Sequence, residues 1–277
     1  MLLKSYTYKK SEIKNWGEVF DNPSDIYLTS FQSGTVKINL KGALNFSHPL
    51  ANNLEDKELE VPILSYWIHH PLAGDILLDT GLDASYIEDQ YGGLDGSSVD
   101  VFKLKSNENI GFYIQKYSIK LKIVFLSHLH ADHAAGVREL PNNIPYIIGK
   151  GEFSQYKPKI HGDFLKGLDK LYELDFNNAQ DMPILGKCVD LLGDNSIWAV
   201  STPGHSPGHI SFILNCIEGP ILLTMDAAFI YENLTRRVAP SDYTWDVILA
   251  QESLDKIIRF LEEYPQVRVG AGHEALK

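Results

Sequence analysis

Short apolar runs, many of them rich in β-branched residues, recur along the chain between polar turns. They predict strands over residues 26–31, 61–68, 75–78, 121–126, 146–148, 197–200, 210–214, 221–225 and 267–269. Helical spacing predicts helices over residues 83–91, 108–117, 132–140 and 245–263. In the last of these, Asp242 or Thr244 can cap the first turn and Pro265 ends the helix.

The helices are interspersed irregularly and do not follow each strand in turn. That order favours a layered α+β sandwich over a doubly wound parallel sheet. No linker rich in Pro, Gly or Ser and no fixed repeat divides the sequence, so we expect a single domain over residues 1–277. Residues 34–60 are polar, irregular and long, which is typical of either a lid or substrate loop or a plain surface excursion.

Composition narrows the class of function. The 277 residues are 44% hydrophobic and 22% charged, which is ordinary for a globular protein, and the net charge of −11 argues against nucleic acid as a partner. No apolar run has the length of a signal peptide or a membrane span. With only Cys188 and Cys216, we expect reduced, packed thiols and a cytoplasmic location.

Three of the ten histidines fall within six positions directly after the predicted strand at 121–126. His128 and His130 alternate as the chain leaves the strand, so both can point at one position. Asp132 and His133 follow at the start of the predicted helix and point at a neighbouring position. Imidazole nitrogen and carboxylate oxygen are ligands of zinc and similar divalent cations, so this segment predicts a metal site.

Further motifs follow in order: Pro-Gly-His205 after one strand, Met-Asp226 at the end of another, and Gly-His273 near the C-terminus. Upstream, Asp79-Thr-Gly ends the strand at 75–78. Together with His-x-His-x-Asp-His, this series resembles the metallo-β-lactamase superfamily over residues 75–273. The resemblance implies a four-layer αββα sandwich, an α+β fold.

The resemblance also implies a dinuclear centre. One ion would be held by His128, His130 and His205, the second by Asp132, His133 and His273, and Asp226 would bridge them. Asp79 would hydrogen-bond a liganding imidazole, as carboxylates beside metal sites often do, whereas His209 would be structural. Zinc suits these ligands, and manganese, iron or cobalt also occupy mixed His/Asp sites.

Within the superfamily, residues 202–212 and 222–228 resemble the N-acyl homoserine lactone lactonases. This implies a metal-dependent hydrolase in which a metal-bridging hydroxide opens a lactone or small ester, with Asp132 passing a proton to the leaving group. Lactonases usually carry a tyrosine three residues after the bridging aspartate, where this chain has Phe229. A phenyl ring cannot donate a hydrogen bond. Tyr231 would lie on the same strand face and could substitute.

Two alternatives remain open. The first is a thioesterase of the glyoxalase II type, which would bind glutathione through basic residues in an added C-terminal region. Lys277 is the only basic residue after His273, which argues against this alternative. A non-catalytic metal-binding module is the alternative of a different class. We expect a small-molecule lactone or ester as substrate, and no nucleic acid or membrane as partner. The sequence leaves the oligomeric state open.

Overall fold

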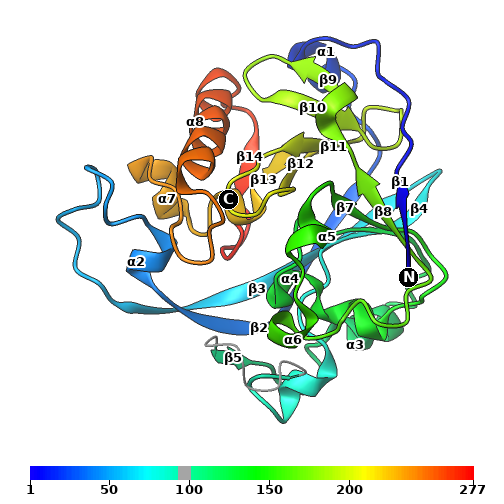
Figure 1. Ribbon diagram of the computed structural model, residues 1–277. Helices are drawn as coiled ribbons and strands as arrows, with labels where there is room; N and C mark the ends of the chain where they lie inside the picture. Colours follow the sequence, from blue (N-terminus) through cyan, green and yellow to red (C-terminus); the bar gives the residue numbers. More distant parts are fainter. Residues whose placement is uncertain (93–100) are drawn as a thin grey trace. The chain divides into compact units, whose positions relative to one another are not determined.

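The computed structural model describes residues 1–92 and 101–277 (Figure 1). Contacts between residues divide it into two compact units, and neither is a continuous stretch of chain. The first unit comprises Met1–Tyr6, Tyr27–Ile38 and Leu59–Leu174, and the second comprises Thr7–Ile26, Asn39–Glu58 and Asp175–Lys277. The single domain over residues 1–277 stays a prediction.

The first unit is built on an eight-stranded sheet with the strand order β1-β8-β7-β6-β4-β3-β2-β5. Its strands are β1 (Leu2–Ser5), β2 (Tyr27–Asn39), β3 (Glu58–His70), β4 (Gly74–Leu78), β5 (Val101–Lys103), β6 (Leu121–Phe125), β7 (Tyr146–Gly149) and β8 (Lys170–Leu174). Its helices are α3 (Ile110–Lys116), α4 (Ala131–Ala134), α5 (Glu152–Gln155) and α6 (Pro158–His161), with 3-10 turns at Ala84–Ile87 and Ala135–Glu139.

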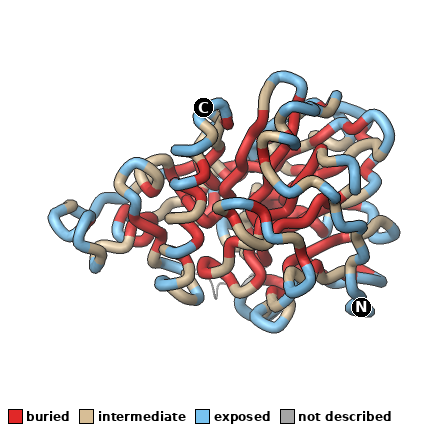
Figure 2. Tube along the Cα trace, turned by 90° about the horizontal axis from the view of Figure 1, so that it is seen from above, coloured by how far each residue is buried: buried red, intermediate tan, exposed pale blue. Residues whose placement is uncertain are grey.

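The parallel pairing of β4 with β6 sets up the polar end of this sheet. Leu78 pairs with Phe125, so both strands end at the same edge. Leu78 and Phe125, which close these two strands, are fully buried. Figure 2 shows in red how much of the described chain is buried. Because parallel strands deliver their carboxyl ends to one side, Asp79 and the histidine segment after Phe125 emerge next to each other.

The second unit is built on a six-stranded sheet with the order β14-β13-β12-β11-β10-β9, antiparallel except where β13 pairs with β14. Its strands are β9 (Gln180–Met182), β10 (Gly186–Asp190), β11 (Ile197–Ser201), β12 (Ile210–Cys216), β13 (Gly219–Leu223) and β14 (Arg268–Gly270). Its helices are α1 (Trp16–Phe20), α2 (Leu40–Ala43), α7 (Tyr231–Arg236) and α8 (Val247–Glu263), with 3-10 turns at Phe176–Asn178 and Met225–Ala227.

Helices α1 and α8 cover one face of this sheet. Trp16 of α1 meets Trp198 of β11 and Phe260 of α8, with ring centroids 5.4 and 5.5 Å away, and all three side chains are fully buried. Truncating one such side chain to alanine costs about 3–5 kcal/mol of stability. Helix α8 begins where the Asp246 carboxylate accepts hydrogen bonds from the N–H groups of Ile248 and Leu249, at 2.9 and 3.0 Å.

Every predicted strand coincides with an observed one, and the α+β class is confirmed. Four local predictions are wrong. The helix over 132–140 is broken into α4 and a 3-10 turn, only a 3-10 turn forms within 83–91, and Asp246 caps α8 instead of Asp242 or Thr244. Residues 34–60 are also not irregular throughout, because β2 continues to Asn39, α2 follows and β3 begins at Glu58. Among the described residues, no helix is long and apolar enough to cross a membrane.

Candidate metal centre

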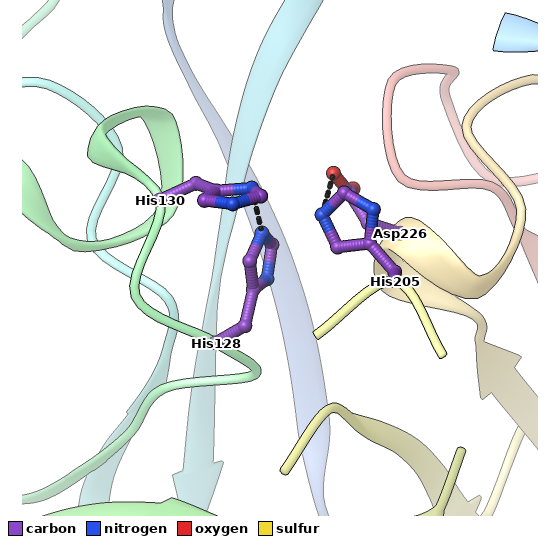
Figure 3. Close-up of side chains that lie close together, drawn as sticks. All are labelled: His128, His130, His205 and Asp226. Atoms are coloured by element: carbon purple, nitrogen blue, oxygen red, sulfur yellow. Dashed lines mark hydrogen bonds and ion pairs between the residues drawn. The ribbon is translucent and has the colours of Figure 1, made fainter. Parts of the chain in front are cut away.

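In the first unit, the chain leaving β6 gathers four potential ligands. His128 Nε2 lies 3.0 Å from His130 Nδ1, and Figure 3 shows these two rings pointing at each other. His130 is the residue before α4, and Asp132 and His133 lie in its single turn, with 3.6 Å between Asp132 Oδ2 and His133 Nε2. His128 and His133 are buried, whereas 14% of the Asp132 side chain is exposed.

Asp79 holds this segment from the end of β4. Its Oδ2 lies 2.7 Å from His133 Nδ1 and accepts a 2.7 Å hydrogen bond from Ser127 Oγ. Its Oδ1 accepts the Ser127 main-chain N–H at 2.6 Å. Because a carboxylate only accepts hydrogen bonds, His133 carries its proton on Nδ1. Its Nε2 is then unprotonated, which is the form in which an imidazole nitrogen binds a metal ion. Ser127 Oγ in turn lies 3.0 Å from His128 Nδ1, which orients a second imidazole.

In the second unit, the Asp226 carboxylate faces two different histidines. Its Oδ2 lies 3.4 Å from His205 Nε2, the pair drawn in Figure 3, and its Oδ1 lies 3.5 Å from His273 Nε2. All three side chains are almost fully buried. Two oxygens of one carboxylate, each beside its own imidazole, have the arrangement of a carboxylate that bridges two ions.

Each of these two histidines follows a glycine that has no room for a side chain. A Cβ on Gly204, whose φ is +135°, would lie 2.1 Å from the main-chain nitrogen of Ala250 at the start of α8. A Cβ on Gly272 would lie 2.5 Å from Asp226 Oδ1. The Gly-His pattern of both motifs therefore has a local cause, since the main chain must pass close to its neighbours.

The donor atoms fit divalent cations. Two ligands of one tetrahedral zinc ion, each at about 2.0–2.1 Å, lie roughly 3.3 Å apart. The nitrogen and oxygen pairs within each unit are separated by 3.0, 3.6, 3.4 and 3.5 Å. The last three exceed normal hydrogen-bond lengths, yet they match neighbouring ligands on an ion. Neutral imidazoles and carboxylates are also the donors that zinc and similar metals take.

Phe229 and Tyr231, our candidates for substrate contact, have different surroundings. The Phe229 ring is buried edge-on against the His205 and His273 rings, with centroid distances of 5.3 and 5.6 Å. The placement of Tyr231 on a strand is wrong: β13 ends at Leu223 and Tyr231 is the first residue of α7. Its hydroxyl lies 2.7 Å from the carbonyl oxygens of Val269 and Ala275, which gives it a structural role.

Sequence reasoning missed two residues that hold the histidine segment. Ser127 links Asp79 to His128, as described above. Glu152, buried at the start of α5, accepts the Leu129 N–H between the two histidines at 3.3 Å. The position of Ser127 directly before the first histidine was a usable signal, whereas Glu152 comes from a separate helix and carries no local pattern.

The two cysteines are not candidates for a nucleophile. Both are buried free thiols. Burial raises the pKa of Cys216 to about 11 and that of Cys188 further. Because the thiolate is the reactive form, both are inert at neutral pH.

Comparison with known proteins gives the family. The profile of the metallo-β-lactamase superfamily matches residues 59–273. The chain is 28% identical over 263 residues to the N-acyl homoserine lactonase AttM of Agrobacterium fabrum, covering 91% of this chain and 94% of the relative. Among solved structures, a quorum-quenching N-acyl homoserine lactone hydrolase matches with a TM-score of 0.68 at 21% identity, covering 91% of this chain and 93% of the other.

A third match is AidC, described as a dizinc quorum-quenching lactonase, with a TM-score of 0.57 at 18% identity, covering 91% of this chain and 88% of the other. The chain therefore belongs to the metallo-β-lactamase superfamily and has its α+β sandwich fold. It is a metal-dependent hydrolase of that superfamily.

Proposed function

We propose that this protein hydrolyses the ring ester of a lactone of the N-acyl homoserine lactone type, or a similar small ester. The relatives that match over nine-tenths of the chain are N-acyl homoserine lactonases, which supports this substrate class. The observation that carries the proposal is the Asp226 carboxylate, whose two oxygens lie beside His205 and His273 separately.

The proposed ligand set is the one that the sequence predicts. His128, His130 and His205 would hold one ion, Asp132, His133 and His273 would hold the other, and Asp226 would bridge them. Zinc is the proposed metal, supported by the donor types and by the dizinc description of AidC. When bound, two such ions lower the pKa of a water molecule and polarise the ester carbonyl.

The protein's own residues supply positioning and proton transfer. Asp79 and Ser127 fix the ring orientations of His133 and His128. Asp132 is proposed to take up a proton and deliver it to the leaving alkoxide. Its partial exposure supports this role, because a group that exchanges protons needs access that the buried Asp226 side chain lacks.

Phe229 is proposed to limit how the substrate carbonyl is stabilised. Its ring is held between two histidines of the proposed ligand set and offers no hydrogen-bond donor. We expect acyl homoserine lactones to be turned over more slowly here than by an enzyme with a tyrosine at this position. Residues 34–60 are proposed as a substrate loop, supported by the exposed Leu50 side chain within them.

The test is hydrolysis of a panel of acyl homoserine lactones with short and long acyl chains by the zinc-loaded protein, followed by proton release. Asp226→Ala serves as the blank. Turnover that disappears in this variant supports a metal-dependent lactonase. No turnover, with two ions bound per chain, would reject the acyl homoserine lactone and direct the search to other esters and to thioesters.

Phe229→Tyr is the matched variant for specificity. If the tyrosine hydroxyl reaches the developing oxyanion, kcat/KM for acyl homoserine lactones rises by about 10–150-fold, because a hydrogen bond to a charged group is worth about 1.5–3 kcal/mol. An unchanged kcat/KM would show that this position does not contact the carbonyl.

The cytoplasm remains our proposed location. Both cysteines are reduced and buried, which is in keeping with a reducing compartment. The net charge of −11 supports a small-molecule substrate over nucleic acid.

A further inference from the structure

His209 is a buried histidine that the proposed mechanism does not use. Its Nε2 accepts a 3.0 Å hydrogen bond from the main-chain N–H of Asp226, and its Nδ1 lies 2.9 Å from Thr202 Oγ1. A main-chain amide can only donate, so Nε2 is the acceptor and Nδ1 carries the proton. The hydrogen bonds therefore hold His209 as a single neutral tautomer.

The hydrogen bonds continue beyond Thr202. Thr202 Oγ1 lies 2.9 Å from Ser211 Oγ, and Ser211 Oγ donates to the carbonyl oxygen of Thr224 at 2.8 Å. That carbonyl can only accept, which sets the direction of every bond in the series. The series starts at the N–H of Asp226 and ends at the carbonyl of Thr224, so it closes on the turn that carries Asp226. All of these side chains are buried.

The turn needs such support. Met225, between Thr224 and Asp226, has a φ of +47°, a left-handed conformation that residues with a side chain rarely adopt. It persists only where the surroundings hold it in place. The turn also sets the direction of the Asp226 carboxylate, whose oxygens must reach His205 and His273 separately.

We propose that His209 is a positioning residue that fixes the Asp226 turn so that the carboxylate spans two metal ions. This inference rests on the proposed bridging role of Asp226. His209 acts through its Nε2 contact to Asp226, and Thr202 acts by keeping the proton on Nδ1. Outer-sphere contacts of this kind typically change metal affinity by about 10–100-fold.

Two substitutions at position 209 separate this role from simple filling of the core. In His209→Gln, the side-chain carbonyl can take the place of Nε2 and accept from Asp226. In His209→Asn, the shorter amide can take the place of Nδ1 and donate to Thr202, but the contact to Asp226 is lost. Thr202→Val, which removes the hydroxyl at nearly constant volume, and Thr202→Ser, which keeps it, form a second matched pair.

The measurements are zinc affinity by competition with a chromophoric chelator and the visible spectrum of the cobalt-loaded protein, with thermal unfolding of the metal-free variants as a check on folding. We expect His209→Gln and Thr202→Ser to keep zinc affinity within about threefold of the wild type. His209→Asn and Thr202→Val should lose at least about tenfold and change the cobalt spectrum.

The proposal is overturned if His209→Gln and His209→Asn bind zinc equally well, because a residue that only fills space would not distinguish them. Asp226→Ala separates this result from a failure of the proposed function. If Asp226→Ala loses an ion while the two His209 variants stay equal, only the positioning role is wrong. If Asp226→Ala keeps both ions, the bridging assignment is wrong, and the positioning role falls with it.

Discussion

Replacing Asp79 by asparagine changes one buried atom beside the histidine segment and should weaken one metal site more than the other. Asparagine has nearly the same shape and tolerates the positive φ of 54° at this position. The amide carbonyl must face the Ser127 N–H, which lies 2.6 Å from Oδ1. The NH₂ group then replaces Oδ2, 2.7 Å from His133 Nδ1.

In the variant, the NH₂ group of the new asparagine would face the Nδ1–H of His133, and two hydrogen-bond donors repel each other. We therefore expect His133 to move its proton from Nδ1 to Nε2. Nε2 is the nitrogen that points to Asp132 and that we propose as the metal ligand. We expect the zinc affinity of the proposed site of Asp132, His133 and His273 to fall by about 10–100-fold, or about 1.4–2.7 kcal/mol. The proposed site of His128, His130 and His205 should change less, because the contact from Asp79 reaches His128 through Ser127.

The assay is zinc titration against a chromophoric chelator, which resolves two successive affinities. Asp190→Asn is the matched control: Asp190 is also a buried carboxylate, but it accepts the N–H groups of Gly193 and Asn195 in a turn after β10. It should bind two ions like the wild type. If Asp79→Asn kept both affinities within about twofold, the orienting role of Asp79 would be refuted.

Three further predictions follow from other contacts. Gly272→Ala places a Cβ 2.5 Å from Asp226 Oδ1 and should reduce zinc affinity by at least about tenfold. Gly17→Ala in α1 is the control and should leave zinc affinity unchanged. Equal zinc affinities of the two variants in a chelator competition would contradict this prediction. Burial raises the pKa of Asp190 above its ordinary 3.8, so this group's contribution to stability is full below pH 3.8 and is lost as pH rises through the raised pKa. Denaturant titrations over this range should give an Asp190→Asn variant whose free energy of unfolding lacks this fall, and the same pH dependence in both proteins would contradict the prediction. Removing the metal with a chelator should lower the melting temperature. Ions that bind only the folded state add about 4 kcal/mol of stability when their free concentration is about 1,000 times the dissociation constant. A melting temperature unaffected by the chelator would argue against bound ions.

Most strands inside the two sheets were predictable from sequence because they are rich in apolar residues, and β12 is buried along its entire length. Strands β8 and β10 also lie inside their sheets but were missed. Strand β1 was missed because all four of its residues are exposed at the sheet edge, and β9 because it is short and polar. Their strand conformation comes from pairing with β8 and β10, which a local pattern does not record.

The candidate ligands were predictable because each lies in a short motif at a strand end. Their supporting contacts were not, since they join distant parts of the chain: Asp79 to His133, and His209 to Asp226. Tyr231 was placed wrongly because the alternation of a strand was extended past Leu223, where β13 ends. The Asn233 side chain accepts the Ile230 N–H at 2.9 Å, and α7 begins at Tyr231. In this helix, the Tyr231 hydroxyl donates to the main-chain carbonyl of Val269.

The most direct test of the account is an anomalous difference map at the zinc edge from crystals of the zinc-loaded protein. We predict two peaks per chain, about 3.5–4 Å apart, with Asp226 contributing one oxygen to each. A single peak, or two peaks with Asp226 bound to only one of them, would contradict the bridged two-metal centre on which the proposed hydrolysis rests.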